Sequence, residues 1–363
     1  MDVDVLIVGA RVAGSVLATL LGEAGLRVLV VDRAAFPSTT LSTHFFRGSG
    51  CGAVLERLGL LEQVLALGPP QLVCQHEYDT LSGTTEVVPP EYPGELGFNL
   101  SVRREPLDAL LVERARSVAK VTVSERTNLL DLVRGDGRFT GARLSGPRGL
   151  IDVGARVVVG ADGYASKVTS LVGAADQERA DPSRVTYYRY VRGMLGPRGE
   201  PDGPEFSLGD DEMLYAFPSD ADMTCVAVSL PLSAYAAMRP HPDAGFRASV
   251  ASHPRVARRF AEATEVGRLS GCGPRPSVVR QPWGPGWALV GDASIHQDPW
   301  TGLGMDNASM HATFLADALV AWLDGREGES EALSRYHERR DAHALDGFHE
   351  TVEIGRNLNA MRG

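Results

Sequence analysis

The first part of the chain alternates between apolar stretches and a helical pattern. Residues 3–8 and 27–32 are mostly apolar and rich in valine, which is typical of buried strands. Between them, residues 12–24 space their apolar side chains with the period of a helix. This order of strand, helix and strand over roughly 30 residues predicts a β-α-β unit.

Similar patterns continue along the chain. Residues 48–66 have a helical period that ends at the breaker Gly68-Pro69-Pro70, and residues 105–119 predict another amphipathic helix. Shorter apolar runs predict strands at 121–124, 129–133, 140–144 and 287–294, and a buried strand that runs into a loop at 156–163. Two closing helices are predicted at 302–323 and 330–350.

The amino-acid composition changes between about residues 175 and 285. Proline and glycine become frequent there, and strand-like runs occur at 184–192, 212–217 and 223–230. This region predicts an antiparallel sheet inserted into the first fold. Tyr188 and Tyr190 share one face of their strand, which is either the wall of an aromatic pocket or a solvated sheet face.

Composition narrows the class of protein. The 363 residues are 44% hydrophobic and 23% charged, as in soluble globular proteins, and their net charge of −10 argues against a nucleic-acid partner. No basic segment precedes the first apolar run, and no apolar stretch is long enough to span a membrane. We therefore expect a cytoplasmic protein without a membrane span.

The four cysteines, Cys51, Cys74, Cys225 and Cys272, are widely spaced and contain no C-x-x-C pair. This spacing favours reduced, mostly buried thiols over a disulfide framework. We predict no metal site.

The turn after the first strand, "VGARVAGS" (8–15), begins and ends like a dinucleotide-binding turn at Gly9 and Gly14. Backbone N–H groups at such a helix start attract a pyrophosphate. Arg11 stands where the middle glycine is usual, and its side chain must turn over the phosphates or toward solvent. Asp32, at the end of the second strand, is placed to accept hydrogen bonds from a ribose.

Three further segments carry a resemblance: "SVRREPLD" (101–108), "VVVGADGYAS" (157–166) and "LVGDASIHQDPWTGLGM" (289–305). With the opening turn, they resemble the flavoprotein monooxygenases of the para-hydroxybenzoate hydroxylase type, together with the related geranylgeranyl reductases and flavin halogenases. The resemblance implies an α/β fold with a Rossmann-like, three-layer FAD-binding domain, an inserted antiparallel-sheet substrate domain and C-terminal helices. It assigns residues 1–60, 100–175 and 286–325 to the FAD-binding domain, 61–99 and 176–285 to the substrate domain, and 326–363 to a C-terminal helix.

The same resemblance implies FAD as the cofactor. Gly9, Ala13 and Gly14 would hold the pyrophosphate, Asp32 with Arg33 the ribose, and Asp292 a ribityl hydroxyl. Arg47 and Arg104 would neutralise the phosphate and contact the ribityl region. The start of the last motif helix would face the flavin pyrimidine edge, and a positive helix end favours the anionic reduced flavin. The remaining residues of the implied cofactor set are Arg11, Asp162, Pro299, Gly302, Gly304 and Met305.

The chain departs from the family pattern at two positions near its end. Ile295 stands at the position of the common histidine, with His296 one step later, and Asp306 replaces a frequent asparagine. His44 and His296 are the candidate catalytic residues, able to orient substrate or transfer a proton; the alternative for both is a structural histidine.

These motifs favour a FAD-dependent monooxygenase that hydroxylates or epoxidises an apolar, aromatic or polyketide-like molecule in bacterial secondary metabolism. Molecular oxygen and NADPH or NADH would be co-substrates, and a separate flavin reductase is a further candidate partner. Halogenation is disfavoured, because the tryptophan-rich halogenase segment is absent and the only lysines, Lys120 and Lys167, match no halogenase lysine. A FAD-dependent C=C reductase stays open, because residues 213–230 and Cys51-Gly52 are similar to geranylgeranyl reductases. A non-enzymatic FAD-binding protein is the third alternative.

Overall fold

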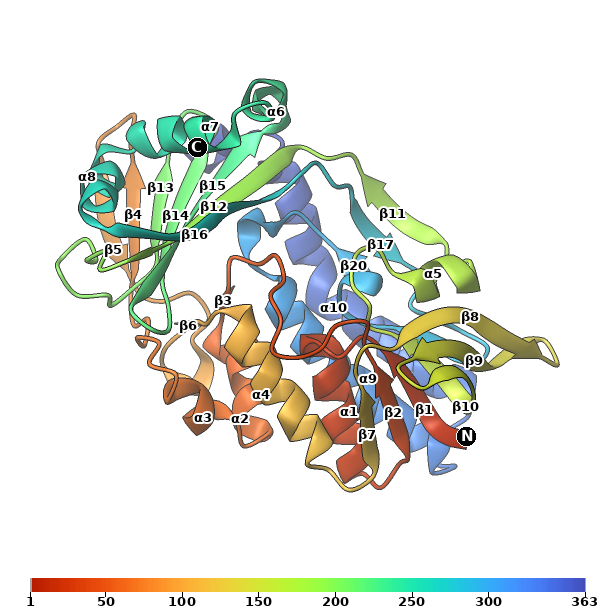
Figure 1. Ribbon diagram of the computed structural model, residues 1–363. Helices are drawn as coiled ribbons and strands as arrows, with labels where there is room; N and C mark the ends of the chain where they lie inside the picture. Colours follow the sequence, from red (N-terminus) through yellow and green to blue (C-terminus); the bar gives the residue numbers. More distant parts are fainter. Residues whose placement is uncertain (1, 363) are drawn as a thin grey trace.

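A computed structural model describes residues 2–362 of the chain (Figure 1). Its first sheet has five parallel strands in the order β19-β10-β1-β2-β7, with short β18 antiparallel at one edge. The hairpin β8–β9 continues from β10. The bounds of these strands are β1 Asp2–Val8, β2 Val28–Val31, β7 Val121–Ser124, β8 Asn128–Gly135, β9 Arg138–Gly146, β10 Gly149–Gly160, β18 Trp283–Gly284 and β19 Trp287–Leu289.

Alternate residues of β1 divide the core between two layers. Val5 and Ile7 face the helices α1 (Val12–Glu23), α4 (Arg104–Arg116) and α9 (Gly304–Leu323), while α10 (Glu329–Gly355) packs on α9. Leu6 and Val8 face the other way, toward β8, β9 and α5 (Lys167–Val172). The first part of the molecule is therefore three-layered, and the predicted α/β class is confirmed.

A second sheet of seven strands lies beside the first part, in the order β16-β12-β15-β14-β13-β4-β5 (Figure 1). Its pairs are antiparallel except β13–β4, which is parallel. Residues 184–230 belong to this sheet and not to the parallel one. The strands are β4 Gln75–Asp79, β5 Thr85–Val88, β12 Arg184–Arg192, β13 Glu205–Leu208, β14 Met213–Pro218, β15 Met223–Pro231 and β16 Thr264–Cys272.

The two faces of the second sheet bury different side chains. Its outer face packs Val185, Leu214 and Val228 against α6 (Leu232–Met238), α7 (Pro242–Ala251) and α8 (Pro254–Glu262) (Figure 1). Its inner face carries Tyr188, Met213, Tyr215, Phe217 and Cys225, which pack with Phe45 and Trp300 of the first part. The inner face therefore forms one wall of the space between the two parts.

Short elements connect the two parts. The strand β3 (Phe45–Phe46) pairs with β6 (Leu100–Ser101), and β17 (Ser277–Arg280) pairs with β11 (Asp176–Ala180) and β20 (Ile295–His296). Short helical turns are η2 Gly94–Leu96, η3 Gly291–Ala293, η4 Pro299–Thr301 and η5 Leu358–Arg362. No helix within residues 2–362 has both the length and the apolar character needed to cross a bilayer.

The helical pattern predicted over 48–66 is divided into three elements in the structure. The segment forms a π-helical turn η1 (Gly48–Gly52), then α2 (Ala53–Arg57) and α3 (Leu61–Leu65). Gly50 has non-helical dihedral angles, and a Cβ there would lie 2.3 Å from a carboxylate oxygen of Asp306. The strand predicted at 287–294 is shorter in the structure. It ends at Leu289, and the chain turns at Gly291 with a φ of +62°.

Candidate cofactor and substrate site

The turn between β1 and α1 contains two positions at which only glycine fits. Gly9 has a φ of +106°, and a Cβ on it would lie 2.3 Å from the carbonyl oxygen of Ala161. A Cβ on Gly14 would lie 1.8 Å from the carbonyl oxygen of Gly9. The first turn of α1 has no side-chain cap and no acidic residue. Its N–H groups are therefore available to an anion such as a pyrophosphate.

Asp32 lies beside this turn at the end of β2. Its carboxylate accepts hydrogen bonds of 2.8 Å from the backbone N–H groups of Ala10 and Ala34, while the neighbouring Arg33 is exposed. The carboxylate thus lies next to the glycine turn, in the place that a ribose-binding acid requires.

Arg11 and Arg104 converge on one carboxylate. Asp108 on α4 is fully buried and pairs with Arg11 Nη1 at 2.5 Å and with Arg104 Nη2 at 2.9 Å. Arg11 also donates to Ser38 and to the Thr39 carbonyl oxygen. Its side chain thus points along the adjoining loop, and not over the phosphates or toward solvent as predicted from the sequence. Asp108 was not among the predicted site residues, although its spacing of four from Arg104 on a helix signals such a pair.

The segment after β19 packs against the turn between β1 and α1. A Cβ on Gly291 would lie 3.1 Å from the Cβ of Ala13, so Asp292 follows directly beside the start of α1. Asp292 Oδ2 lies 3.3 Å from Nδ1 of His296, whose buried ring packs on Tyr164 at 4.3 Å between centroids. Asp292 and His296 therefore form one hydrogen-bonded unit.

The start of α9 also suits a bound anionic ring. Gly302 adopts a φ of +69°, Gly304 opens the helix without a side-chain cap, and a Cβ on Gly304 would contact nothing within 4 Å. Met305 is buried against the core, and Pro299 begins η4. Two uncapped helix starts and the tight glycine turn together fit a bound FAD.

The carboxylate of Asp162 is hydrogen-bonded to the start of α5. Its carboxylate accepts from the Ser166 hydroxyl at 2.6 Å and from the backbone N–H groups of Lys167 and Val168, at the start of α5. Burial raises the pKa of Asp162, opposed by these hydrogen bonds. Its contacts are those of a helix cap.

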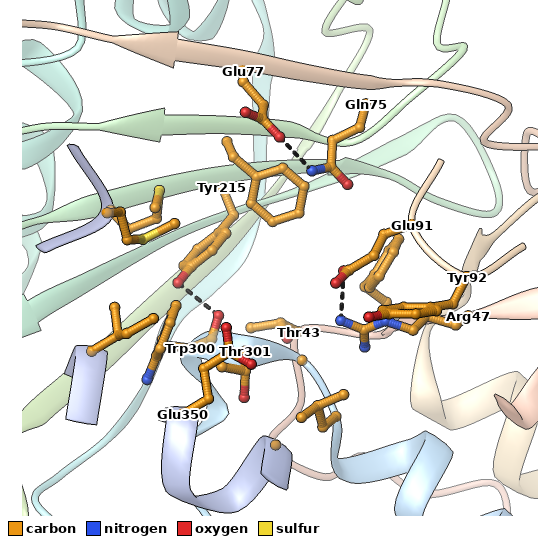
Figure 2. A pocket seen from close by; sticks show the side chains of 18 of the residues that line it. Thr43, Arg47, Gln75, Glu77, Glu91, Tyr92, Tyr215, Trp300, Thr301 and Glu350 are labelled. Atoms are coloured by element: carbon orange, nitrogen blue, oxygen red, sulfur yellow. Dashed lines mark hydrogen bonds and ion pairs between the residues drawn. The ribbon is translucent and has the colours of Figure 1, made fainter. Parts of the chain in front are cut away.

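Asp306 joins α9 to the π-helical turn η1. Its Oδ1 accepts from the backbone N–H groups of Arg47, at 3.1 Å, and Cys51, at 2.9 Å, and its Oδ2 pairs with Arg47 Nη1 at 3.3 Å. Arg47 also pairs with Glu91 at 2.8 Å (Figure 2). Burial raises the pKa of Asp306, and the Arg47 charge opposes this shift. Asp306 stands where the family frequently has asparagine. Its carboxylate therefore supplies a second acceptor oxygen and a charge partner for Arg47.

A cavity of about 1050 Å³ lies between the inner face of the second sheet, η4, the start of α9 and α10 (Figure 2). The hydroxyl of Tyr215 donates to the Trp300 carbonyl oxygen at 2.8 Å, and Trp300 Nε1 donates to Thr351 on α10 at 2.9 Å, which fixes this wall. The aromatic lining residues are Phe45, Tyr78, Tyr92, Phe206, Tyr215, Phe217 and Trp300.

Carboxylates outnumber cations around this cavity. Its lining contains seven acids, Glu77, Asp79, Glu86, Glu91, Asp306, Asp346 and Glu350, against two arginines, Arg47 and Arg362. Arg47 pairs with Glu91 and Asp306, and Arg362 pairs with Asp79. Within residues 2–362 the other four acids have no ion-pair partner. We call Glu77, Glu86, Asp346 and Glu350 the acidic rim. It could not be recognised in the sequence, because it combines the unpredicted β4 and β5 with the end of α10.

His44 lies in a buried aromatic cluster. It has a φ of +70°, its Nε2 is hydrogen-bonded to the hydroxyl of Tyr190, and its ring meets Tyr188 edge-on at 5.9 Å. Burial, helped by the nearby charges of Arg104 and Arg103, lowers the pKa of His44 to about 3, and burial raises the pKa of Tyr190. The solvated alternative for this sheet face is therefore wrong at Tyr188, which is only 6% exposed.

Comparisons with known proteins agree with this geometry. A family model described as FAD binding domain matches residues 2–349. The chain is 24% identical to digeranylgeranylglycerophospholipid reductase 1 of Methanopyrus kandleri over 99% of this chain and 91% of that protein. It is 28% identical to digeranylgeranylglycerophospholipid reductase of Methanothrix thermoacetophila over 88% of this chain and 78% of that protein.

Solved structures share the fold. The structure of PqsL, a probable FAD-dependent monooxygenase from Pseudomonas aeruginosa, superposes with a TM-score of 0.79 at 24% identity, covering 99% of this chain and 96% of PqsL. The flavin-dependent brominase Bmp2 superposes with a TM-score of 0.83 at 21% identity, covering 94% of this chain and 84% of Bmp2. These similarities show the common fold of the two parts.

Proposed function

Because this chain belongs to the FAD binding domain family and is an FAD-dependent oxidoreductase, we propose that it is a monooxygenase that hydroxylates or epoxidises an aromatic or polyketide-like small molecule. The observation that carries the proposal is the aromatic-lined cavity of about 1050 Å³ that adjoins the uncapped start of α9. A cavity of this size and lining accommodates a small organic substrate.

Bound FAD would accept a hydride from NADPH or NADH and activate molecular oxygen. The overall reaction balances as substrate, O₂, NAD(P)H and a proton giving oxygenated substrate, water and NAD(P)⁺. In our proposal the glycine turn and Ala13 hold the pyrophosphate, Asp32 the ribose and Asp292 the ribityl chain. The start of α9 would lie at the pyrimidine edge of the bound cofactor. Arg104 and Arg11 add positive charge from their shared position on Asp108.

The chain's own contribution to the reaction is to hold the substrate and exclude water. Tyr215 and Trp300 fix the aromatic wall through their hydrogen bonds, and Phe217 adds a further ring. His44 is hydrogen-bonded to Tyr190 within a buried cluster, and neither side chain lines the cavity, so we propose the structural role that was its alternative. Neither Lys120 nor Lys167 lines the cavity, which weakens the halogenase alternative.

A FAD-dependent C=C reductase is the second candidate function, and the similarity to digeranylgeranylglycerophospholipid reductases favours it. The acidic rim argues against it, because unpaired carboxylates repel the anionic phosphate of such a lipid. The proposal also includes a role in secondary metabolism, a cytoplasmic location and the domain bounds predicted from the sequence. A separate flavin reductase is the alternative electron source, if NADPH and NADH do not reduce the bound FAD directly.

Turnover with and without oxygen tests the proposal. Purified protein is incubated with NADPH or NADH and a panel of aromatic amines, polycyclic aromatic ketones and digeranylgeranylglycerophospholipid. We expect oxygenated product in air and none under anaerobic conditions. Consumption of a C=C substrate that continues without oxygen would instead establish the reductase.

A further inference from the structure

A second cluster of reactive side chains lies outside the candidate FAD and substrate site. The Sγ of Cys74 lies 3.5 Å from Nε2 of His76, and the same Nε2 lies 2.7 Å from Oδ1 of Asp202. The three ligand atoms all lie within 4.8 Å of one another. Because Cys74 and Asp202 contact the same imidazole nitrogen, the cluster cannot act as a catalytic triad, which requires contacts to opposite nitrogens.

The backbone of β4 and of the loop 193–204 brings Cys74, His76 and Asp202 close together. Cys74 and His76 are two residues apart along β4 and its entry, so their side chains lie on one face of the strand. The carbonyl oxygen of Asp202 accepts from the backbone N–H of Val73 at 2.9 Å. A Cβ on the next residue, Gly203, would lie 2.5 Å from the carbonyl oxygen of Cys74 and 3.0 Å from its Sγ. Only glycine lets the loop bring Asp202 this close to Cys74.

Thiolate, imidazole and carboxylate are the three ligand types that proteins use to bind Zn²⁺. Zn–S of about 2.3 Å and Zn–N of about 2.0–2.1 Å in a tetrahedral site require S···N of about 3.6 Å and N···O of about 3.3 Å. The distance from Cys74 to His76 already matches, and the distance from His76 to Asp202 must open by about 0.6 Å. Cys74 Sγ and the Asp202 carboxylate, which lie within 4.8 Å of each other, must come to about 3.6 Å. His76 is 4% exposed, so its ring is held in place by the fold.

The structure shows Arg198 in contact with two of these three residues. Its Nη2 pairs with Asp202 and lies 3.6 Å from Sγ of Cys74, while its side chain is 56% exposed. The guanidinium therefore supplies the positive charge that the carboxylate needs when no metal is bound, and it can move into solvent. An entering divalent cation would replace this charge.

We propose that Cys74, His76 and Asp202 bind Zn²⁺ or a similar borderline-soft divalent cation, with water as the fourth ligand. Binding releases the thiol proton of Cys74 and fixes the loop 193–204 to β4. On β4, Gln75 and Glu77 alternate with these ligands and line the substrate cavity from the opposite face. The metal thus stabilises the strand that carries one end of the acidic rim, and the proposal does not depend on the reaction catalysed.

Metal content of untagged, FAD-containing protein tests the site. After equilibration with Zn²⁺ and gel filtration, we expect about one equivalent of zinc per chain by mass spectrometry, and a higher melting temperature than in EDTA-treated protein. Cys74→Ser, His76→Gln and Asp202→Asn should each lose the bound zinc and the thermal shift. The matched control Cys272→Ser, a half-buried thiol elsewhere, should keep both. Mg²⁺, which prefers oxygen ligands, should produce no shift.

Arg198→Ala separates a metal site from a merely structural hydrogen-bonded cluster. Removal of the competing cation should tighten zinc binding by at least threefold in a chelator competition. Wild-type protein without stoichiometric zinc would overturn the proposal. So would zinc that His76→Gln and Cys74→Ser retain, or an Arg198→Ala variant that loses stability without gaining zinc affinity. FAD content, measured in every sample by absorbance, reports folding independently of the metal.

Discussion

Nη1 of Arg11 lies 2.5 Å from Oδ2 of Asp108, whose side chain is fully buried. This pair ties the dinucleotide turn to α4, and Arg104 completes it from the other side of the carboxylate. Arg11, the residue that departs from the usual glycine, therefore has a structural partner of its own. The Asp108 carboxylate therefore already neutralises part of the positive charge of Arg11 before a phosphate binds.

We expect Arg11→Gly to weaken FAD binding by less than tenfold, or about 1.4 kcal/mol. The reason is that Arg104 keeps the Asp108 carboxylate paired and keeps one charge near the phosphates. A titration of apoprotein with FAD measures the effect. As the matched comparison, Asp108→Asn should destabilise the fold by about 3–5 kcal/mol in urea, because it leaves two arginines without their buried acid. A hundredfold loss of FAD affinity in Arg11→Gly would make Arg11 a principal cofactor ligand.

Asp306→Asn should lower the free energy of unfolding by about 1–3 kcal/mol. The amide keeps one acceptor oxygen for the N–H groups of Arg47 and Cys51 but turns donors toward the Arg47 guanidinium. The control is Glu91→Gln, which removes an exposed partner of the same arginine and should cost about 0–1 kcal/mol. Equal effects of the two variants in urea unfolding would show that Asp306 is not the main partner of Arg47.

His311→Leu should reduce the loss of stability on acidification. His311 is fully buried on α9 without a hydrogen-bond partner in residues 2–362, near His343, Arg340 and Asp341 of α10. Burial, reinforced by His343, holds its pKa well below the ordinary value of about 6.5. Below pH 6.5 the unfolded chain therefore binds a proton that the folded chain refuses, and stability falls as the pH falls.

This histidine alone contributes up to about 1.4 kcal/mol per pH unit below 6.5. Urea unfolding at pH 7.5, 6 and 5 should therefore show a smaller pH dependence in His311→Leu than in the wild type. The exposed His241→Leu serves as the control and should leave the slope unchanged. An identical slope in His311→Leu and the wild type would mean that His311 is protonated in the folded state.

The acidic rim should rank ligands by charge. We expect the cation tryptamine to bind more tightly than neutral 3-methylindole, and the anion indole-3-propionate most weakly, as measured by changes in flavin absorbance. The combined change Glu77→Gln and Glu350→Gln should improve binding of the anion by about threefold to tenfold, since each removed charge acts near a low-dielectric cavity. Glu62→Gln on α3, away from the cavity, is the matched control. If the three ligands bind with affinities that do not follow their charge, the acidic rim does not contribute to substrate selection.

The β-α-β unit and its glycine turn could be predicted because their signals are local. The strand β1 is a valine-rich run, α1 has apolar residues on all sides, and Gly9 and Gly14 stand where a tight approach demands them. The strands β12, β14 and β15 are apolar enough to be recognised as well. In contrast, β4 reads "QHEYD" and is only partly buried, so no apolar alternation identifies it.

The site partners were not predictable for a different reason. Asp306 lies 259 residues from Arg47, and Asp202 lies 126 residues from His76. Nothing local marks either carboxylate as the partner of a distant side chain, because the pairing is made by packing of α9 on η1 and of the loop 193–204 on β4. Motif resemblance supplied the predicted cofactor residues, whereas the acidic rim and the Cys74–His76–Asp202 cluster required the fold.

Incorporation of oxygen-18 tests the proposed monooxygenase most directly. Purified protein is reduced with NADPH or NADH under oxygen-18 gas, in the presence of the aromatic ligand that binds most tightly in the charge series. We expect a product that carries one oxygen-18 atom from the gas and none when the label is supplied as water. A reduced product without oxygen-18, formed equally well in the absence of oxygen, would contradict the account.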